Sequence, residues 1–252
     1  MVQLDNIVGI DPSFTGLGMT VINLEHKTLA LKEFGTDLKG GSFSHIVEAT
    51  DEMVKTAISS LPENTSLVGM EIPPTQGFYA VKLYALDTHL YRLLKENEIQ
   101  TYLFGVPYLR YINGKSSKKE DTISTVIELM KIFSRHGFSF FQTNAEVMRL
   151  TEKKSKTLAY AEVNNQPYFG FTHNQADSFI YAVRMLVLFA TCFPQVIVNT
   201  GLVDLIHDIV DYKPRFAIIK ETLTGKSDKS VTPYHVFEEI YQIPVDYIKT
   251  NE

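Results

Sequence analysis

The stretch NIVGIDPSFTGLGMTVINLE, residues 6–25, constrains the fold most, because a single carboxylate lies between two apolar runs. Residues 7–10 predict a buried strand and residues 19–24 a second one, with a glycine-containing turn over residues 13–18. A carboxylate at the end of a buried strand is costly unless its charge is compensated. Two roles are therefore open for Asp11: it opens a turn before Pro12, or it is the ligand of a metal ion.

The order of the remaining elements predicts a mixed α/β sheet with helices on its faces. KTLALKEFGT indicates a third strand, so three consecutive antiparallel strands occupy residues 6–36. Two helices and two strands follow: a helix from His45 to about Leu61 capped by Ser44, a buried strand SLVGMEIPP that closes on Glu71, a helix from Gln76 to about Asn97, and the strand QTYLFGVP. Further helices are predicted from about Glu120 to His136 and from Asn174 to Phe193.

A chain of 252 residues, 44% of them hydrophobic, can bury one sizeable core. We expect residues 1–194 to form this domain, with an irregular insertion at about 137–171 that contains one helical segment at most. Residues 195–252 are expected to form a C-terminal appendage of unknown role. The lone Cys192 has apolar neighbours, which is typical of a small core residue in a reducing cytoplasm.

The apolar runs are too short to predict a membrane protein. The longest, residues 185–193, falls well below the ~20 residues that span a bilayer. The N-terminus enters a strand almost at once and lacks the pattern of an export signal. We therefore expect a cytoplasmic protein without a membrane span.

The net charge of −5, from 24 Lys and Arg against 29 Asp and Glu, is not the basic excess typical of a general nucleic-acid binder. Binding to DNA would have to depend on local basic patches. Two such patches occur, at residues 115–119 and 153–156. A solvated loop is an equally good interpretation of each one.

Three acidic residues occupy comparable places in the predicted elements. Asp11 lies in the first strand, Glu71 ends the fourth, and Asp177 lies in the first turn of the last helix. If the first and fourth strands are neighbours, these carboxylates converge, and they must then share protons or hold hard divalent cations. Two cations roughly 4 Å apart activate a water and stabilise the leaving oxygen of a phosphodiester. The plainer alternatives are a strand-end surface residue for Glu71 and a favourable helix-dipole position for Asp177.

The ordered set of motifs resembles the RuvC-like branch of the ribonuclease H-like superfamily, the Holliday-junction resolvases, especially those of phages and viruses. The likeness covers residues 6–193 except the insertion, and its motifs are VGIDPSFTGLGMTV, VGMEIPP, AVKL, VPYLRYINGKSSKKE and HNQADSFIYA. The resemblance implies a ribonuclease H-like mixed five-stranded sheet, three antiparallel strands then parallel strands, with helices on both faces. It also implies a crossover junction endodeoxyribonuclease of DNA recombination and repair that uses two Mg²⁺ or Mn²⁺ ions and leaves 5′-phosphates.

The resemblance implies that Asp11, Glu71 and Asp177 are the catalytic metal ligands. In this family the last helix offers a further acid or histidine about one turn before its final aspartate. This sequence has His173 and Asn174 there instead. Either residue is a candidate fourth ligand, with His173 preferred because imidazole is the better ligand, and an imidazole suits manganese better than magnesium. The alternative is that His173 or Asn174 only caps the helix.

The loop VPYLRYINGKSSKK matches the family's order of proline, basic residue, glycine and lysine. A loop of this kind beside carboxylates can hold a scissile phosphate and neutralise its developing charge. Lys118 and Lys119 are equal candidates for the catalytic lysine, and Arg110 and Lys115 are further candidates for DNA contacts.

The helix that begins near residue 76 forms the homodimer interface in relatives, and an aromatic residue near its start stacks into the opened junction. Phe78 and Tyr79 are the candidates for stacking on unpaired bases here. Plain core packing is the alternative for both side chains.

The favoured hypothesis is a homodimer that resolves four-way or other branched DNA by paired nicks, because a two-fold dimer places two active sites on a two-fold junction. If the source is a phage, the protein would act in the host cytoplasm. One alternative is a catalytically degenerate junction-binding protein, which Asn174 in place of an acid supports. The other is an actin-like or sugar-kinase-type ATPase, but the sequence shows neither its second phosphate-binding hairpin nor its adenosine-binding motif.

Overall fold

A mixed six-stranded sheet forms the centre of the protein. The computed structural model describes residues 6–13, 16–35, 42–71, 80–104, 112, 119–142, 159–164, 166–192, 197 and 201–216. The strands of this sheet are β1 (Asn6–Asp11), β2 (Leu17–Asn23), β3 (Thr28–Phe34), β4 (Thr65–Glu71), β5 (Thr101–Phe104) and β6 (Ser139–Gln142). Strands β1, β2 and β3 are antiparallel, whereas β4 and β5 extend the sheet parallel to β1, and β6 lies parallel to β3. The order across the sheet is therefore β5-β4-β1-β2-β3-β6.

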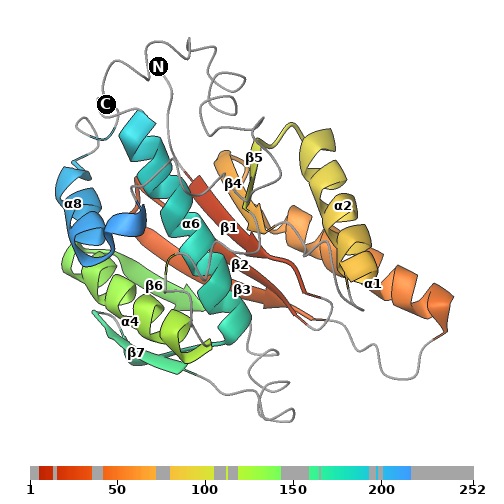
Figure 1. Cartoon of the computed structure of the whole chain (residues 1–252), viewed down its shortest axis with the longest axis horizontal. Coiled ribbons are helices and arrows are strands. Elements are labelled where there is room, and N and C mark those ends of the chain that lie inside the picture. The colour runs from red at the N-terminus through yellow and green to blue at the C-terminus, as the bar shows by residue number, and fades with distance from the viewer. Residues whose placement is uncertain are drawn as a thin grey trace.

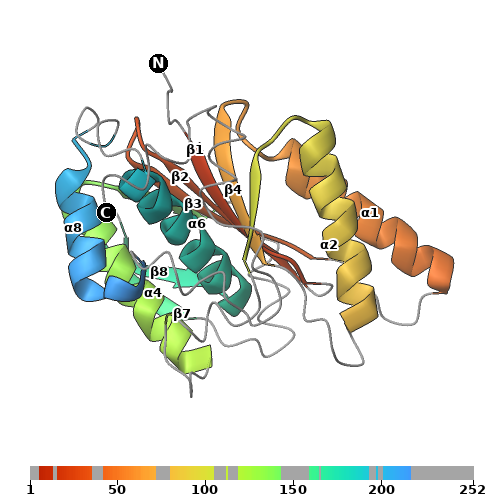
Figure 2. The same ribbon diagram turned by 45° about the horizontal axis from the view of Figure 1, so that its top comes forward.

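Helices cover both faces of this sheet (Figures 1 and 2). Helices α1 (Phe43–Ser59) and α2 (Ala80–Glu96) share a core cluster with one set of strand residues, among them Val8 and Ile10. Helices α4 (Lys119–Arg135), α6 (His173–Cys192) and α8 (Val203–Tyr212) share the larger cluster with the opposite set, among them Ile7 and Ile22. Because both faces are covered, every residue of β1 is buried.

The packing of α6 against the sheet depends on three glycines. A Cβ atom on Gly9 would lie 1.9 Å from the carbonyl oxygen of Ser178 and 2.4 Å from the amide nitrogen of Ala182. A Cβ on Gly18 would lie 2.1 Å from the carbonyl oxygen of Asn174, and one on Gly69 would lie 2.6 Å from the side chain of Met185. The backbone of α6 therefore lies directly on β1 and β2, at distances that no larger residue allows, whereas the helix contacts β4 at Gly69 through the side chain of Met185.

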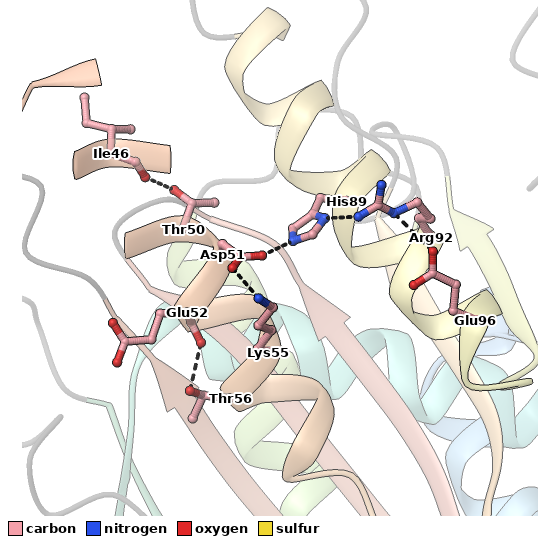
Figure 3. A network of polar contacts seen from close by, with 9 residues as sticks. All are labelled: Ile46, Thr50, Asp51, Glu52, Lys55, Thr56, His89, Arg92 and Glu96. Atoms are coloured by element: carbon pink, nitrogen blue, oxygen red, sulfur yellow. Dashed lines mark hydrogen bonds and ion pairs between the residues drawn. The ribbon is translucent and has the colours of Figure 1, made fainter. Parts of the chain in front are cut away.

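A polar network on the other side of the sheet connects α1 to α2 (Figure 3). Asp51 on α1 accepts hydrogen bonds from Lys55 at 2.6 Å and interacts with Nε2 of His89 on α2 at 2.9 Å. Lys55, then His89, lowers the pKa of Asp51. Arg92 lies between His89 and Glu96, at 3.3 and 3.4 Å. Pairs as exposed as these add little stability.

The predicted fold class is confirmed, since the strand order and directions are those of a ribonuclease H-like sheet with helices on both faces. The predicted number of five strands is wrong, because β6 adds a sixth at the β3 edge. The predicted irregular insertion at 137–171 contains β6 and a separate antiparallel pair, β7 (Ala159–Val163) and β8 (Gln166–Phe171). These strands are only four to six residues long, too short to give a clear period in the sequence.

Helix boundaries differ from the prediction by a few residues. Helix α1 begins at Phe43 and its cap is Ser42, whose hydroxyl accepts from the amide of His45, so the predicted cap at Ser44 is wrong. The start predicted for the second helix, at Gln76, lies outside the described residues. Helix α6 begins at His173, so Asp177 lies one turn inside the helix instead of in its first turn.

The segment after α6 packs onto the same core. Leu202, Leu205 and Ile209 of the α8 region are almost fully buried, together with Phe216 in a short 3₁₀ helix, Pro214–Phe216. At the surface, His136 and Arg135 contact Asp208 at 2.9 and 3.5 Å. Within the described part of the chain, no helix combines the length and apolar character that crossing a bilayer would need.

Candidate active site

Strands β1 and β4 bring Asp11 and Glu71 to one edge of the sheet. The two strands are parallel, with Gly9 opposite Gly69 and Ile10 opposite Met70, so the next residue of each is a carboxylate. Both glycines face α6, and side chains two residues apart in a strand share a face. Asp11 and Glu71 therefore lie side by side, on the face that α6 covers.

Helix α6 supplies the third carboxylate. Its first turn lies over β2 next to Gly18, and Gly18 pairs with Asp11 across the sheet. Asp177 follows one turn later and is 5% exposed, Asp11 is 7% exposed, and Glu71 is partly exposed. The predicted convergence of the first strand, the fourth strand and the last helix is thus present in the structure, although the roles of the three residues stay predictions.

Burial weakens the acidity of all three carboxyl groups, and repulsion between carboxylates adds to this effect at Asp11 and Glu71. The pKa of Asp11 is raised well above its ordinary value by burial, then by the charges of Asp177 and Glu71. Burial raises the pKa of Glu71 to about 7, and a hydrogen bond with Asp11 opposes that rise. Burial also raises the pKa of Asp177. These shifts favour a proton shared between Asp11 and Glu71, one of the two outcomes expected of converging carboxylates.

Basic residues approach the cluster from the start of two helices. His173 Nδ1 lies 3.0 Å from Oδ2 of Asp177, one turn away on α6. This hydrogen bond and the charges of His173 and Lys119 lower the pKa of Asp177 and so oppose the effect of its burial. Lys119 is exposed at the first position of α4. Of the two predicted catalytic lysines, Lys119 thus lies within electrostatic reach of the cluster, whereas Lys118 lies outside the described residues.

Asn174 has a structural role at this site. Its amide nitrogen donates to the carbonyl oxygen of Gly16 at 2.6 Å and to Oε1 of Glu33 at 3.1 Å. The predicted alternative that His173 or Asn174 caps the helix is wrong, because the cap is Thr172. Thr172 Oγ1 accepts from the amide of Gln175 at 3.3 Å, and Gln175 Oε1 accepts from the amide of Thr172 at 2.9 Å. This reciprocal pair is a capping box.

Two buried acids near the cluster were missed by sequence reasoning. Glu33 on β3 is 2% exposed and contacts the first turn of α6, and the alternation of Leu29, Leu31 and Glu33 on the buried face of its strand could have revealed it. Asp87 on α2 is 6% exposed, and its pKa is raised to about 8 by burial and then by the charge of Glu71. Its place after Leu86 in an amphipathic helix gave only a weak signal.

The donor set suits a hard divalent cation, although no complete ligand shell is formed. Among the described residues, no three His, Cys, Asp or Glu side chains are grouped as a ready metal site. The residue types are those such cations prefer, because three carboxylates supply oxygen ligands. Oδ1 of Asp177 is also buried, and no group in the described part of the chain donates a hydrogen bond to it. A cation bound by these carboxylates would replace the shared proton and give Oδ1 of Asp177 a partner.

The remaining predicted DNA-binding residues cannot be placed. Phe78, Tyr79, Arg110 and Lys115 all lie outside the described residues, as does the basic patch at 153–156.

No protein-family profile matches the sequence, and comparison with curated proteins gives no match. Among solved structures, the chain is similar to T. thermophilus RuvC in complex with a Holliday junction substrate, at 12% identity and a TM-score of 0.42, over 82% of this chain and 95% of that chain. It is also similar to the human cytomegalovirus terminase nuclease domain, at 13% identity and a TM-score of 0.34, over 74% of this chain and 83% of that chain. These similarities are too low to assign residue roles.

Proposed function

We propose that the protein is a divalent-metal-dependent endonuclease that cuts branched DNA. The observation that carries this proposal is the convergence of Asp11, Glu71 and Asp177, from three separate elements, around an unsatisfied carboxylate oxygen. Three ionised carboxylates at this place destabilise the fold, since burial penalises the charge of each one and repulsion adds to that cost at Asp11 and Glu71. A cation that binds there would offset this cost, so the cluster is better explained by chemistry than by stability.

Asp11, Glu71 and Asp177 would hold the cations. Two bound Mg²⁺ or Mn²⁺ ions supply an activated water and stabilisation of the leaving oxygen of a phosphodiester. For its part, the chain must release the proton that Asp11 shares with Glu71, because only ionised carboxylates bind such ions well. His173 contacts Oδ2 of Asp177 and so leaves Oδ1, which is buried without a hydrogen-bond partner among the described residues, as the oxygen for a cation.

Lys119 is the residue we propose for contact with the scissile phosphate. It is exposed at the first position of α4, and its charge lowers the pKa of Asp177. An ammonium group at that place would neutralise charge that develops on the phosphate during cleavage. Arg110, Lys115 and Lys118, which precede it in the chain, would extend the contact along the DNA backbone.

The branched substrate, the homodimer and the 5′-phosphate products are inferred from the resemblance of the sequence motifs to Holliday-junction resolvases. The net charge of −5 supports a restricted DNA contact over a general affinity for nucleic acid. Paired nicks require two active sites related by the two-fold symmetry of the junction, which a homodimer supplies.

A nicking assay tests this proposal. Purified protein is incubated with a labelled four-way junction or a matched linear duplex in Mg²⁺ or Mn²⁺, next to Asp11→Asn and the exposed control Glu63→Gln. We expect paired, metal-dependent nicks in the junction only, a loss of at least about 100-fold with Asp11→Asn, and no change with Glu63→Gln. Ligation of the products tests for 5′-phosphates.

A second candidate function is a junction binder without chemistry, which is favoured by the position of Asn174. Its amide is committed to Gly16 and Glu33, so it adds no charge to the cluster. Tight binding to the junction without cutting in either metal would support this candidate and overturn the nuclease proposal. A thermal shift assay gives a separate check, because Mn²⁺ should stabilise the wild type and have less effect on Asp11→Asn.

A further inference from the structure

Glu33 on β3 pairs with Gly18, which in turn pairs with Asp11, and its side chain contacts the start of α6. It is 2% exposed. One carboxylate oxygen accepts from the amide of Asn174 at 3.1 Å, and the other accepts from the hydroxyl of Thr172. Both donors are neutral groups of the first turn of α6 or its cap. Glu33 thus joins the third strand of the sheet to the beginning of the helix that supplies Asp177.

The same contact includes the turn before β2. The amide nitrogen of Asn174 that reaches Glu33 also donates to the carbonyl oxygen of Gly16 at 2.6 Å. A Cβ atom on Gly16 would lie 2.2 Å from Oε1 of Glu33 and 2.9 Å from Nδ2 of Asn174, so a larger residue there would have to displace these two side chains. The turn before β2, strand β3 and the distant first turn of α6 are therefore joined through the amide of Asn174.

The contact with Thr172 connects Glu33 to the cap of α6. Thr172 uses its hydroxyl oxygen to accept from the amide of Gln175, and its hydroxyl hydrogen is donated to Glu33. Its carbonyl accepts the first helical hydrogen bond, from Ala176 at 2.9 Å. A negative charge near a helix N-terminus is also favoured by the helix dipole. Glu33 consequently supports the cap, the first turn and, one residue further, Asp177.

We propose that Glu33 is a positioning residue, which clamps the first turn of α6 to β2 and β3 and so fixes Asp177 relative to Asp11 and Glu71. This inference rests on the proposed function insofar as the cluster binds a cation. The clamp also explains why an amide at position 174 is compatible with the site. A carboxylate there would face Glu33 at hydrogen-bonding distance, and two like charges would push the first turn of the helix away from the sheet.

Two variants of Glu33 and one control separate positioning from stability. Glu33→Met removes both acceptors and fills the volume, whereas Glu33→Gln keeps an acceptor for Asn174 and a polar group for Thr172. Thr20→Val is the matched control, because it removes another buried bond from the sheet to α6, the 2.8 Å contact with Ser178, without touching the first turn. Amide hydrogen exchange at residues 174–177 and binding of Mn²⁺ by calorimetry are measured for the full chain.

We expect Glu33→Met to speed exchange at residues 174–177 and to weaken Mn²⁺ binding by about tenfold or more, as loss of a supporting residue does at metal sites. Glu33→Gln and Thr20→Val should stay close to wild type in both measurements. Unchanged exchange in Glu33→Met would overturn the proposal, as would an equal loss of Mn²⁺ affinity in Thr20→Val. If wild-type protein binds no Mn²⁺, the proposed function fails, and exchange at residues 174–177 alone decides the role of Glu33.

Discussion

At the scale of single residues, the site contains buried acidic groups whose ionised forms destabilise the folded protein. Asp11, Glu71 and Asp87 all have raised pKa values, with burial as the first cause in each. Asp87 adds a fourth carboxyl group within electrostatic reach of Glu71, and within the described residues its Oδ1 has no hydrogen-bond partner. The cation-free protein therefore loses stability wherever these groups must ionise.

This property predicts an unusual dependence of stability on pH. The pKa of Asp87 is 3.8 ordinarily and about 8 in the folded protein, so the folded protein holds this proton more tightly than the unfolded chain. Its contribution is complete below about pH 3.8 and is lost as the pH rises toward 8. The stability that Glu71 contributes is lost in the same direction, as the pH rises from 4.5 to about 7. In EDTA, the protein should be more stable near pH 5 than near pH 8.

Asp87→Asn should remove part of that loss. We expect the variant to be more stable than wild type at pH 8, on the order of a few kcal/mol, and little changed near pH 4. Thermal unfolding at several pH values in EDTA, with Glu63→Gln as an exposed control, measures this. An equal shift at pH 4 and pH 8 would show that Asp87 acts through packing instead of charge.

At the scale of elements, the sequence could predict the parts that have long, regular patterns. The three-strand meander, the Glu71 strand and α6 were found because each has a strong apolar period bounded by turn residues. β6, β7 and β8 were missed because short strands give too few repeats to define a period. The Thr172 capping box was readable as a threonine followed three residues later by a glutamine, before an apolar run.

The contacts between elements could not be predicted in the same way. Glu33 and Asn174 are 141 residues apart in the sequence, and no local pattern indicates that they meet. The alternation in β3 shows only that Glu33 points inward. The partner of Glu33 is set by the position of α6 along β1 and β2, and this position depends on the glycines beneath the helix.

Gly9→Ala tests the close packing of α6. The added Cβ would contact the backbone of Ser178 and Ala182, which cannot move without shifting the helix. We expect a loss of about 3 kcal/mol or more in the free energy of unfolding, at the upper end for overpacking, and weaker Mn²⁺ binding. Chemical denaturation measures the first and calorimetry the second.

Gly137→Ala provides the contrast for this test. Gly137 has φ of +84° and open space around its Cβ position, so its substitution strains the backbone without moving α6. It should cost about 1 kcal/mol and leave Mn²⁺ binding unchanged. Equal effects of both substitutions on Mn²⁺ binding would argue against a role for the α6 position.

At the scale of the whole molecule, the residues that follow α6 share its core. Leu205 and Ile209 are buried against the cluster that includes α4 and α6, whereas Asp208 meets His136 and Arg135 at the surface. The boundary predicted at residue 194 stays a prediction. What the packing implies is that α8 unfolds together with the sheet.

Ile209→Ala tests this coupling. Truncation of a fully buried isoleucine should cost about 2–5 kcal/mol and lower the midpoint of a single unfolding transition. Asp208→Asn should have little effect, because its ion pairs are exposed. A separate early transition in Ile209→Ala, with the main one unchanged, would show that α8 is an independent appendage.

The bond between Asn174 and Gly16 also bears on the timing of synthesis, since its two residues are separated by 158 positions. At about 5–20 residues per second, a ribosome needs about 8–30 s to travel from the first to the second. Throughout that interval the nascent chain holds Asp11 but not Asp177, so the acidic cluster is incomplete. A cell that makes this protein is therefore exposed to the completed site only after α6 has been translated.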